Sequence, residues 1–408
     1  MTQAADLAYA TRRADDVRLI AGVSAAHFVS HYYILVLPPL FAFIRADYGV
    51  SYTEIGLALT VFNAVSAVLQ TPAGFLVDRV NARFVLVAGL MCGAAGLAIA
   101  SMVNSYWVLI AMFGLMGIGN TVYHPADYAL LSRYVSAERA SQAYSIHTFA
   151  GMAGGAAAPA TILLMYSSFG WRGAFMGAAI VGFLVAVALL FQRDETPARP
   201  VAKPRTEPRI EATLPDTSWR LLLSAPILIN FVFFMLLSMT NFGLMNFSVV
   251  ALGALHGTSA VTANTALTSN LALGAIGVLV GGLVAARSDR HALIAASFMS
   301  VTTVACLLMA SVDLGSILLV LVMSLAGFSM GALMPSRDMI VREVTPPGAH
   351  GKVFGFVTNG FNIAGMLSPL ICGALMDHGE PRILFLTLAA TSVLAIFTVI
   401  SVPRRRAA

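Results

Sequence analysis

The sequence predicts an all-α polytopic membrane protein with twelve transmembrane helices in two pseudo-symmetric six-helix halves. Three observations predict it: the composition, the long stretches without charge, and an internal repeat. Of the 408 residues, 58% are apolar and 11% are charged, against roughly 45 to 50% and about 25% in soluble domains. The composition therefore excludes a soluble enzyme and a disordered chain, and the length allows about a dozen spans of about 20 residues each.

Stretches free of Asp, Glu, Lys and Arg define the helices, because a charge at the centre of a bilayer costs at least about 2.5 to 3.5 kcal/mol. Two double-length stretches are divided at Asn104-Ser105 and at His256-Gly257. The predicted helices span residues 18–44, 54–77, 84–103, 107–132, 140–166, 171–192, 220–253, 262–286, 291–311, 315–341, 352–376 and 382–402.

The remaining residues form tails and a linker. Residues 193–219 are rich in proline among mixed charges, a composition that cannot bury a core, so we expect a linker between two bundles. The predicted parts are an N-terminal tail (1–17), a first bundle (18–192), the linker (193–219), a second bundle (220–402) and a basic tail (403–408).

The basic residues predict the orientation. All of the 24 Lys and Arg residues except Arg45, Arg172 and Arg382 fall on the side of the two termini. The positive-inside rule therefore predicts cytoplasmic termini in a cell inner (plasma) membrane. The first residues are polar and no short apolar stretch with a cleavage site follows, so we expect no cleaved signal peptide.

The two predicted halves repeat each other. A shift of 208 to 210 residues aligns five Gly, Arg and Pro positions in order: Gly74 with Gly282, Arg79 with Arg287, Pro125 with Pro335, Gly155 with Gly365 and Pro159 with Pro369. Duplicated six-helix halves are typical of one large class of secondary transporters.

The segment between the second and third helices reads Gly74-Phe-Leu-Val-Asp78-Arg79-Val-Asn81-Ala-Arg83. This motif, with the repeat, resembles the signature of the major facilitator superfamily, although Asn81 replaces the family's usual glycine. The resemblance covers the chain from Arg18 to Arg404 and implies that family's fold. It also implies gating roles for Gly74, Asp78, Arg79 and Arg83, and for Arg287 and Glu343 in the second half, where Ala286 replaces the first Asp.

The fourth helix reads Gly117-Ile-Gly-Asn120-Thr-Val-Tyr123-His124-Pro-Ala-Asp127. Together with His31-Tyr-Tyr and Leu37-Pro-Pro in the first helix, it is similar to the fosmidomycin-resistance group of bacterial efflux carriers. That similarity implies export of a small organic compound or drug.

Titratable groups gather in the first half. Asp127 of the first half, like Arg337 and Asp338 of the second, lies well inside a predicted helix, where ionisable groups indicate function. Four titratable groups of the first half, Asp127, His124, His147 and His27, reach a similar depth. Asn120, His124 and Asp127 share one helix face. Because histidine titrates near physiological pH, we expect proton coupling at Asp127, His124, His31, His27 and His147. The alternative is interhelical hydrogen bonding, and no metal site is expected.

The second half carries neutral polar side chains instead. We expect Asn241, Asn270, Asn359 and Asn362 to recognise a substrate as neutral donors and acceptors, with Arg337 as an anchor for an anion. Asn120, Tyr123 and Tyr32 are the candidates for the same role in the first half. The alternative for each Asn is polar contact between helices. Cys92, Cys306 and Cys372 show neither disulfide nor zinc spacing. We expect no cofactor, no catalytic residue and no nucleic-acid partner.

The sequence thus predicts a secondary active transporter that is coupled to protons and works by alternating access. We expect it to act as a monomer in the lipid bilayer on a small molecule, and to export it. Proton-coupled uptake of a small organic acid is the first alternative. A polytopic membrane enzyme or a receptor is the remote one, because no convincing catalytic motif occurs.

Overall fold

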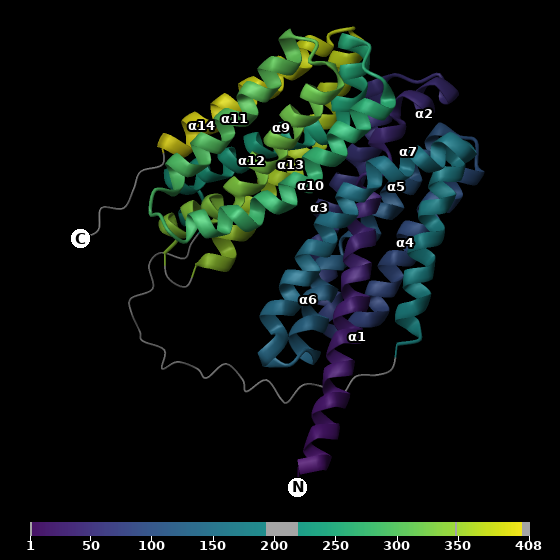
Figure 1. The fold of residues 1–408 in the computed structure, drawn as a ribbon, viewed down its shortest axis with the longest axis vertical. Coiled ribbons are helices and arrows are strands. Elements are labelled where there is room, and N and C mark those ends of the chain that lie inside the picture. The colour runs from purple at the N-terminus through teal and green to yellow at the C-terminus, as the bar shows by residue number, and fades with distance from the viewer. Residues whose placement is uncertain (1, 193–218, 347–348, 402–408) are drawn as a thin grey trace. The chain divides into compact units, whose positions relative to one another are not determined.

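In the computed structural model, residues 2–192, 219–346 and 349–401 are described, and every regular element among them is a helix (Figure 1). Eleven of these helices are long and apolar enough to cross a membrane. One candidate span, Gln142–Leu190, has 49 residues, more than twice the roughly 20 that one crossing needs. The predicted all-α membrane fold is confirmed, while most of the predicted linker (193–219) and all of the predicted basic tail (403–408) lie outside the described residues.

The elements of the first half differ from the predicted helices at three breaks. The first helix stops before Pro38-Pro39, because proline lacks the amide donor that a helix interior needs. The fourth is interrupted after Asn120, and the fifth and sixth are joined with a kink at Gly170, where φ is 68°. The elements are α1 (Thr2–Ile34), η1 (Pro38–Leu40), α2 (Phe41–Tyr48), α3 (Tyr52–Arg79), α4 (Ala82–Met102), α5 (Tyr106–Asn120), α6 (Tyr123–Tyr134) and α7 (Ala137–Leu190).

The second half follows the predicted helices closely. Ser259 caps the second long helix by accepting a hydrogen bond from the amide of Thr262, as serine does at helix starts. The first long helix ends at Gly257, whose φ of 66° favours glycine. The elements are α8 (Trp219–Leu222), α9 (Ala225–His256), α10 (Ala260–Ala285), α11 (His291–Ser311), α12 (Gly315–Val344), α13 (His350–Asp377) and α14 (Pro381–Ser401).

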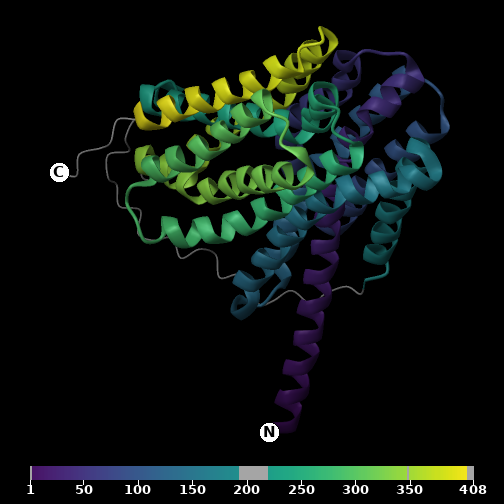
Figure 2. The ribbon, with the colours of Figure 1, turned by 45° about the horizontal axis from the view of Figure 1, so that its top comes forward.

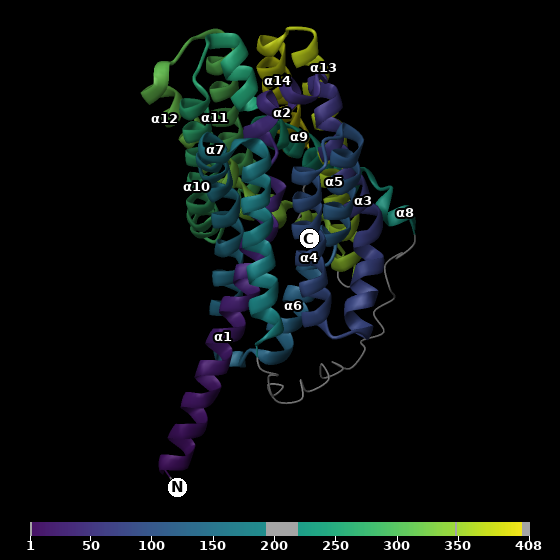
Figure 3. The same ribbon diagram turned by 90° about the vertical axis from the view of Figure 1, so that its right-hand side faces the viewer.

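The chain divides into two compact units. The first unit comprises residues 1–36, 65–158 and 165–212, and the second comprises residues 37–64, 159–164 and 213–408. Within the first unit α4 packs along α5, and α1 contacts α6 and α4 (Figure 3). Within the second, α10 lies along α12, and α14 packs against α9 and α11 (Figure 2). The division at 193–219 predicted from composition stays a prediction.

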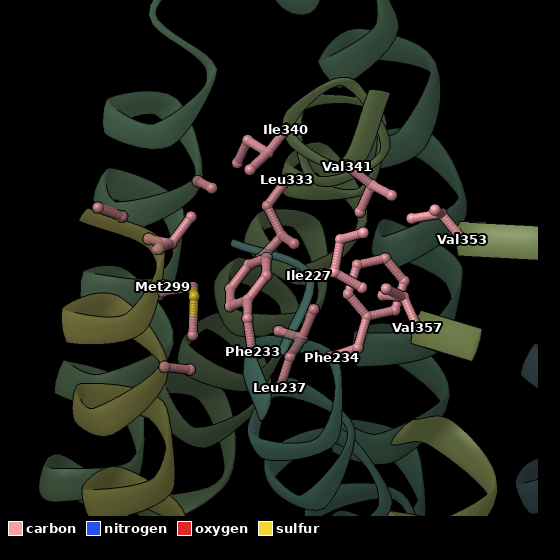
Figure 4. Close-up of a cluster of buried hydrophobic side chains, with 14 of the residues drawn as sticks. Ile227, Phe233, Phe234, Leu237, Met299, Leu333, Ile340, Val341, Val353 and Val357 are labelled. Atoms are coloured by element: carbon pink, nitrogen blue, oxygen red, sulfur yellow. The ribbon is translucent and has the colours of Figure 1, made fainter. Parts of the chain in front are cut away.

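Apolar side chains fill the centre of the second unit (Figure 4). Phe233 and Phe234 on α9 are fully buried, beside Met299 of α11, Leu333 of α12 and Val357 of α13. Lipid tails are as apolar as these side chains, so close packing rather than escape from water stabilises such a core in a membrane.

Candidate functional site

Two glycines on α7 let α1 approach it closely within the first unit. A Cβ atom at Gly154 would collide with the backbone carbonyl of Phe28, and one at Gly151 would lie 2.5 Å from Cε1 of His27. Any larger residue would push the helices apart. These glycines therefore set the distance at which α1 presents His27 to α7.

Four histidine rings meet where α1, α6 and α7 come together. The rings of His27 and His147 are stacked, with centroids 3.8 Å apart and planes 10° from parallel. His27 also contacts His31 at 4.6 Å and His124 at 5.2 Å between ring centroids. Nδ1 of His27 donates to the backbone carbonyl oxygen of His147 at 2.8 Å. This bond fixes the tautomer of neutral His27 and leaves Nε2 as its acceptor.

Asp127 of α6 completes the cluster. Asp127 and His147 are both fully buried, and Oδ2 of Asp127 lies 3.7 Å from Nε2 of His147. Among the described residues, neither carboxylate oxygen and neither nitrogen of the His147 ring has a hydrogen-bond partner. An isolated buried charge is costly, so the pair has two favourable forms: both groups neutral, or an imidazolium beside a carboxylate. We call His27, His31, His124, Asp127 and His147 the histidine cluster.

The break between α5 and α6 positions two members of the cluster. Tyr123 begins α6 and donates its hydroxyl to the carbonyl oxygen of Gly89 on α4 at 3.0 Å. His124 and Asp127 follow Tyr123 at the start of α6. They are three residues apart and hence on one helix face.

Exposure differs across the cluster. His124 is exposed, as is Tyr128, at 47%, whose ring centroid lies 5.7 Å from that of His147. His31 is half-buried, whereas His27, His147 and Asp127 are buried. The cluster therefore runs from an accessible surface of the first unit to a buried carboxylate, and neighbouring titratable groups can pass a proton along it.

Comparison with known proteins identifies the family. The model of the Major Facilitator Superfamily matches residues 23–253 and 232–408. The chain belongs to the Major Facilitator Superfamily. It is a multi-pass membrane transporter, and the resemblance stated from the sequence is confirmed.

Three proteins illustrate the range of similarity. The fosmidomycin resistance protein of Escherichia coli (strain K12) is 21% identical over 383 residues, 93% of this chain and 92% of that one. A probable L-galactonate transporter of the same organism is 27% identical over 154 residues, 37% of this chain and 34% of that one. A crystal structure of the nucleoside transporter NupG superposes with a TM-score of 0.75 at 16% identity, covering 95% of this chain and 98% of that one.

Three imidazoles of the histidine cluster lie close enough together to be compared with a metal site. One ring nitrogen each from His27, His124 and His147 lie within 4.8 Å of one another. A single ion needs nitrogens that converge on it at about 2.0 to 2.1 Å. The lone pairs of the nitrogens lie in the ring planes, and the planes of His27 and His147 are stacked 10° from parallel, so the rings would have to turn before both could bind one ion.

The substrate-binding candidates of the first unit contact other residues of the same unit. Nδ2 of Asn120 donates to Oγ of Ser66 at 3.3 Å. Tyr123 holds α6 to α4, as described above, and Tyr32 is buried with its ring 6.2 Å from that of Phe28. Each therefore has a packing contact, and their part in substrate binding stays a prediction.

The candidates of the second unit are also engaged. Nδ2 of Asn270 donates to the carbonyl oxygen of Met323 at 2.8 Å, which ties α10 to α12. Asn241 contacts Sδ of Met245 at 3.1 Å, and Nδ2 of Asn362 donates to Oδ1 of exposed Asn359 at 3.3 Å.

Arg337 is held on several sides within the second unit. Its guanidinium lies 2.8 Å from a carboxylate oxygen of Asp338, and 4.6 Å and 5.1 Å from the ring centroids of Phe234 and Phe361. An anion that binds there would have to compete with Asp338.

The gating candidates lie at helix ends. Arg79 and Arg287 are exposed, Gly74 is half-buried, and Glu343 lies 3.9 Å from Nε2 of His291. The side chain of Asp78 lies outside the described residues. Arg83 is buried and donates to the carbonyl oxygen of Gln192 at 2.8 Å. Their gating roles stay predictions.

Sequence reasoning missed two contributors to the cluster, Tyr128 and Gly151. Tyr128 follows His124 by four residues, so helical periodicity placed it on the same face. Gly151 had no such signal, because its importance depends on how closely α1 approaches.

Proposed function

We propose that the protein is a proton-coupled secondary transporter that works by alternating access, with Asp127 and His147 carrying the coupling proton. One observation supports this most: the two groups are fully buried, 3.7 Å apart, and without hydrogen-bond partners among the described residues. A buried pair used only for packing would be expected to be hydrogen-bonded. A pair without such bonds can take up or release a proton without breaking a hydrogen bond.

The rest of the cluster supplies the route. His124 is exposed and stands three residues before Asp127, while His27 stacks on His147 and contacts His31. Histidine is the side chain whose ordinary pKa lies closest to physiological pH. A proton that enters at His124 can therefore reach Asp127 by passing between neighbouring groups of the cluster.

We further propose that the transporter exports a small organic compound. The fosmidomycin resistance protein, whose name indicates protection from a drug, is similar along 93% of this chain. Neutral Asn side chains and Arg337 would bind the compound, and Gly74, Asp78, Arg79, Arg83, Arg287 and Glu343 would gate its passage. The protein would act as a monomer in the plasma membrane, by antiport, with both termini in the cytoplasm.

Proton-coupled uptake of an organic acid is the second candidate. The probable L-galactonate transporter, named for an organic acid, supports it through a similarity that covers 37% of this chain. The direction of substrate movement under an imposed pH gradient in sealed vesicles separates the two. Antiport predicts movement against the proton, and symport predicts movement with it.

The test replaces the carboxyl group of Asp127 by an amide of the same shape. In proteoliposomes with a compound selected from a panel of neutral and acidic organic molecules, we expect Asp127→Asn to lose uphill transport driven by a pH gradient. Counterflow of substrate against substrate should persist, because it needs no net proton movement. His124→Gln should show the same defect less completely.

Two further variants serve as the control and as the test of a competing site. Glu380→Gln removes an exposed acid and should leave gradient-driven transport unchanged. Asp338→Asn removes the other acid well inside a helix. If Asp338→Asn uncouples transport while Asp127→Asn does not, the coupling site lies on α12 and the proposal is wrong. Loss of counterflow in Asp127→Asn would instead assign Asp127 to substrate binding or to the fold.

A further inference from the structure

The start of α3 satisfies its backbone amides in two ways. Ser51 and Glu54 form a reciprocal cap: the amide of Ser51 donates to Oε2 of Glu54 at 2.7 Å, and the amide of Glu54 donates to Oγ of Ser51 at 3.1 Å. The first turn of a helix leaves further amides without partners in the helix itself. Here these are the amides of Tyr52 and Thr53.

The carboxylate of Asp377 accepts hydrogen bonds from both of these amides. Its Oδ1 accepts from the amide of Tyr52 at 2.6 Å, and its Oδ2 accepts from the amide and the hydroxyl of Thr53 at 2.8 and 2.6 Å. Asp377 is the last residue of α13, where a carboxylate is unfavourable because the C-terminal end of a helix carries partial negative charge. The same carboxylate is favourable at the N-terminal end of α3. Its position therefore benefits a helix more than 300 residues away in sequence and not its own.

The neighbouring turns of α3 and α13 touch backbone to backbone. A Cβ atom at Gly373 would lie 2.7 Å from Cα of Thr53, and one at Gly56 would lie 2.8 Å from the carbonyl oxygen of Pro369. Farther along, Oγ1 of Thr60 donates to the carbonyl oxygen of Met366 at 3.0 Å. The contact is thus close and polar, and all of these residues belong to the second unit.

We propose that Asp377 is a releasable latch at the non-cytoplasmic end of this transporter, which holds the start of α3 to the end of α13. The sequence assigns these helices to different six-helix bundles, so a carrier that opens on that side must part them. Asp377 is exposed, and water can therefore replace each of its hydrogen bonds as the helices separate. The latch needs alternating access and is independent of how protons are coupled.

The test follows the separation of the two helix ends through labels on the adjoining helices α2 and α14. Nitroxide labels at Ala46→Cys and Arg382→Cys, both exposed positions, are placed in a protein in which Cys92, Cys306 and Cys372 are alanine. The distance distribution is then recorded by pulsed electron paramagnetic resonance. Asp377→Asn keeps the shape of the side chain but has one acceptor oxygen, so at least one amide loses its partner. We expect the ratio of separated to closed molecules to rise about tenfold or more, which corresponds to about 1.4 kcal/mol.

Matched variants distinguish a latch from a surface charge or a helix cap. Glu380→Gln removes the same charge three residues away, and Glu54→Gln weakens the cap of α3 while Asp377 stays in place. Neither should change the distance distribution, although Glu54→Gln should lower the melting temperature. If Glu380→Gln shifts the distribution as much as Asp377→Asn does, the effect is general charge and the latch is wrong.

Thr53→Val provides a second variant in case Asp377→Asn does not fold. It removes one of the three hydrogen bonds and keeps the two to the backbone, so we expect a smaller shift in the same direction. A distribution that matches the parent protein in both Asp377→Asn and Thr53→Val, or in Thr53→Val alone where the other does not fold, would overturn the proposal.

Discussion

The two units use buried polar side chains differently. In the first, the carboxylate of Asp127 and the rings of His27 and His147 come from three helices and meet. In the second, buried Asn246 and Asn264 donate to carbonyl oxygens four residues earlier on their own helices. Both units retain buried polar atoms without partners among the described residues, including Oδ1 of Asn264. Asp127 and His147 therefore differ from Asn246 and Asn264 in their ability to take up a proton, which an amide lacks.

The largest expected effect comes from the close approach that builds the histidine cluster. Gly154→Ala would drive a Cβ atom into the backbone of Phe28, whereas a Cβ at Gly155 would meet only Cδ1 of Leu35, at 3.6 Å. Overpacking of this kind costs about 1 to 3 kcal/mol or more. We expect Gly154→Ala to lower the melting temperature in detergent and abolish transport, and Gly155→Ala to change neither. Equal behaviour of the two variants would contradict the role given to this approach.

A smaller effect separates titration from packing. His147→Phe keeps an aromatic ring that can stack on His27 but cannot accept a proton. We expect it to lose gradient-driven transport and keep counterflow, with unfolding midpoints close to those of the parent protein. Asn246→Leu in the second unit should lower stability by about 0.6 kcal/mol, as for one polar contact in a membrane bundle, and remain coupled. An uncoupled Asn246→Leu would show that coupling can be lost without removing a titratable group, which would contradict the comparison.

The smallest effect concerns orientation and leaves transport unchanged. Cysteine introduced at Arg172, which is predicted to lie outside, should react with an impermeant reagent in intact cells. Cysteine at Arg205 in the predicted linker should react only after the membrane is permeabilised. The reverse pattern would invert the predicted topology and move the proposed latch to the cytoplasmic side.

Local sequence signals predicted most of the fold. Charge-free stretches located the helices, since charge is expensive in a bilayer. The positions at which the helices break were harder to predict. Pro38 ends α1 within a stretch taken as one helix, and the interruption between α5 and α6 falls just before Pro125. Both breaks follow from proline, but the sequence did not decide whether each proline would kink its helix or end it.

Only the parts of the candidate site that lie close together on one helix could be predicted from the sequence. Helical spacing placed His124 and Asp127 on one face, and the same rule reaches Tyr128. The stacking of His27 on His147 depends on contact between α1 and α7 across 120 residues of chain. Asp377 and Thr53 are farther apart still. Such contacts arise from the packing of whole helices, which no local pattern in a single sequence encodes.

Proton movement by the first unit is the central claim, and substrate-dependent pH change in proteoliposomes tests it most directly. The protein is reconstituted with a pH-sensitive dye inside the vesicles, and compounds from the panel are added without any imposed gradient. We predict that at least one compound changes the internal pH with the parent protein and with Asn246→Leu, and that the change is lost in Asp127→Asn. An equal pH change in Asp127→Asn, on the same compound, would contradict the account.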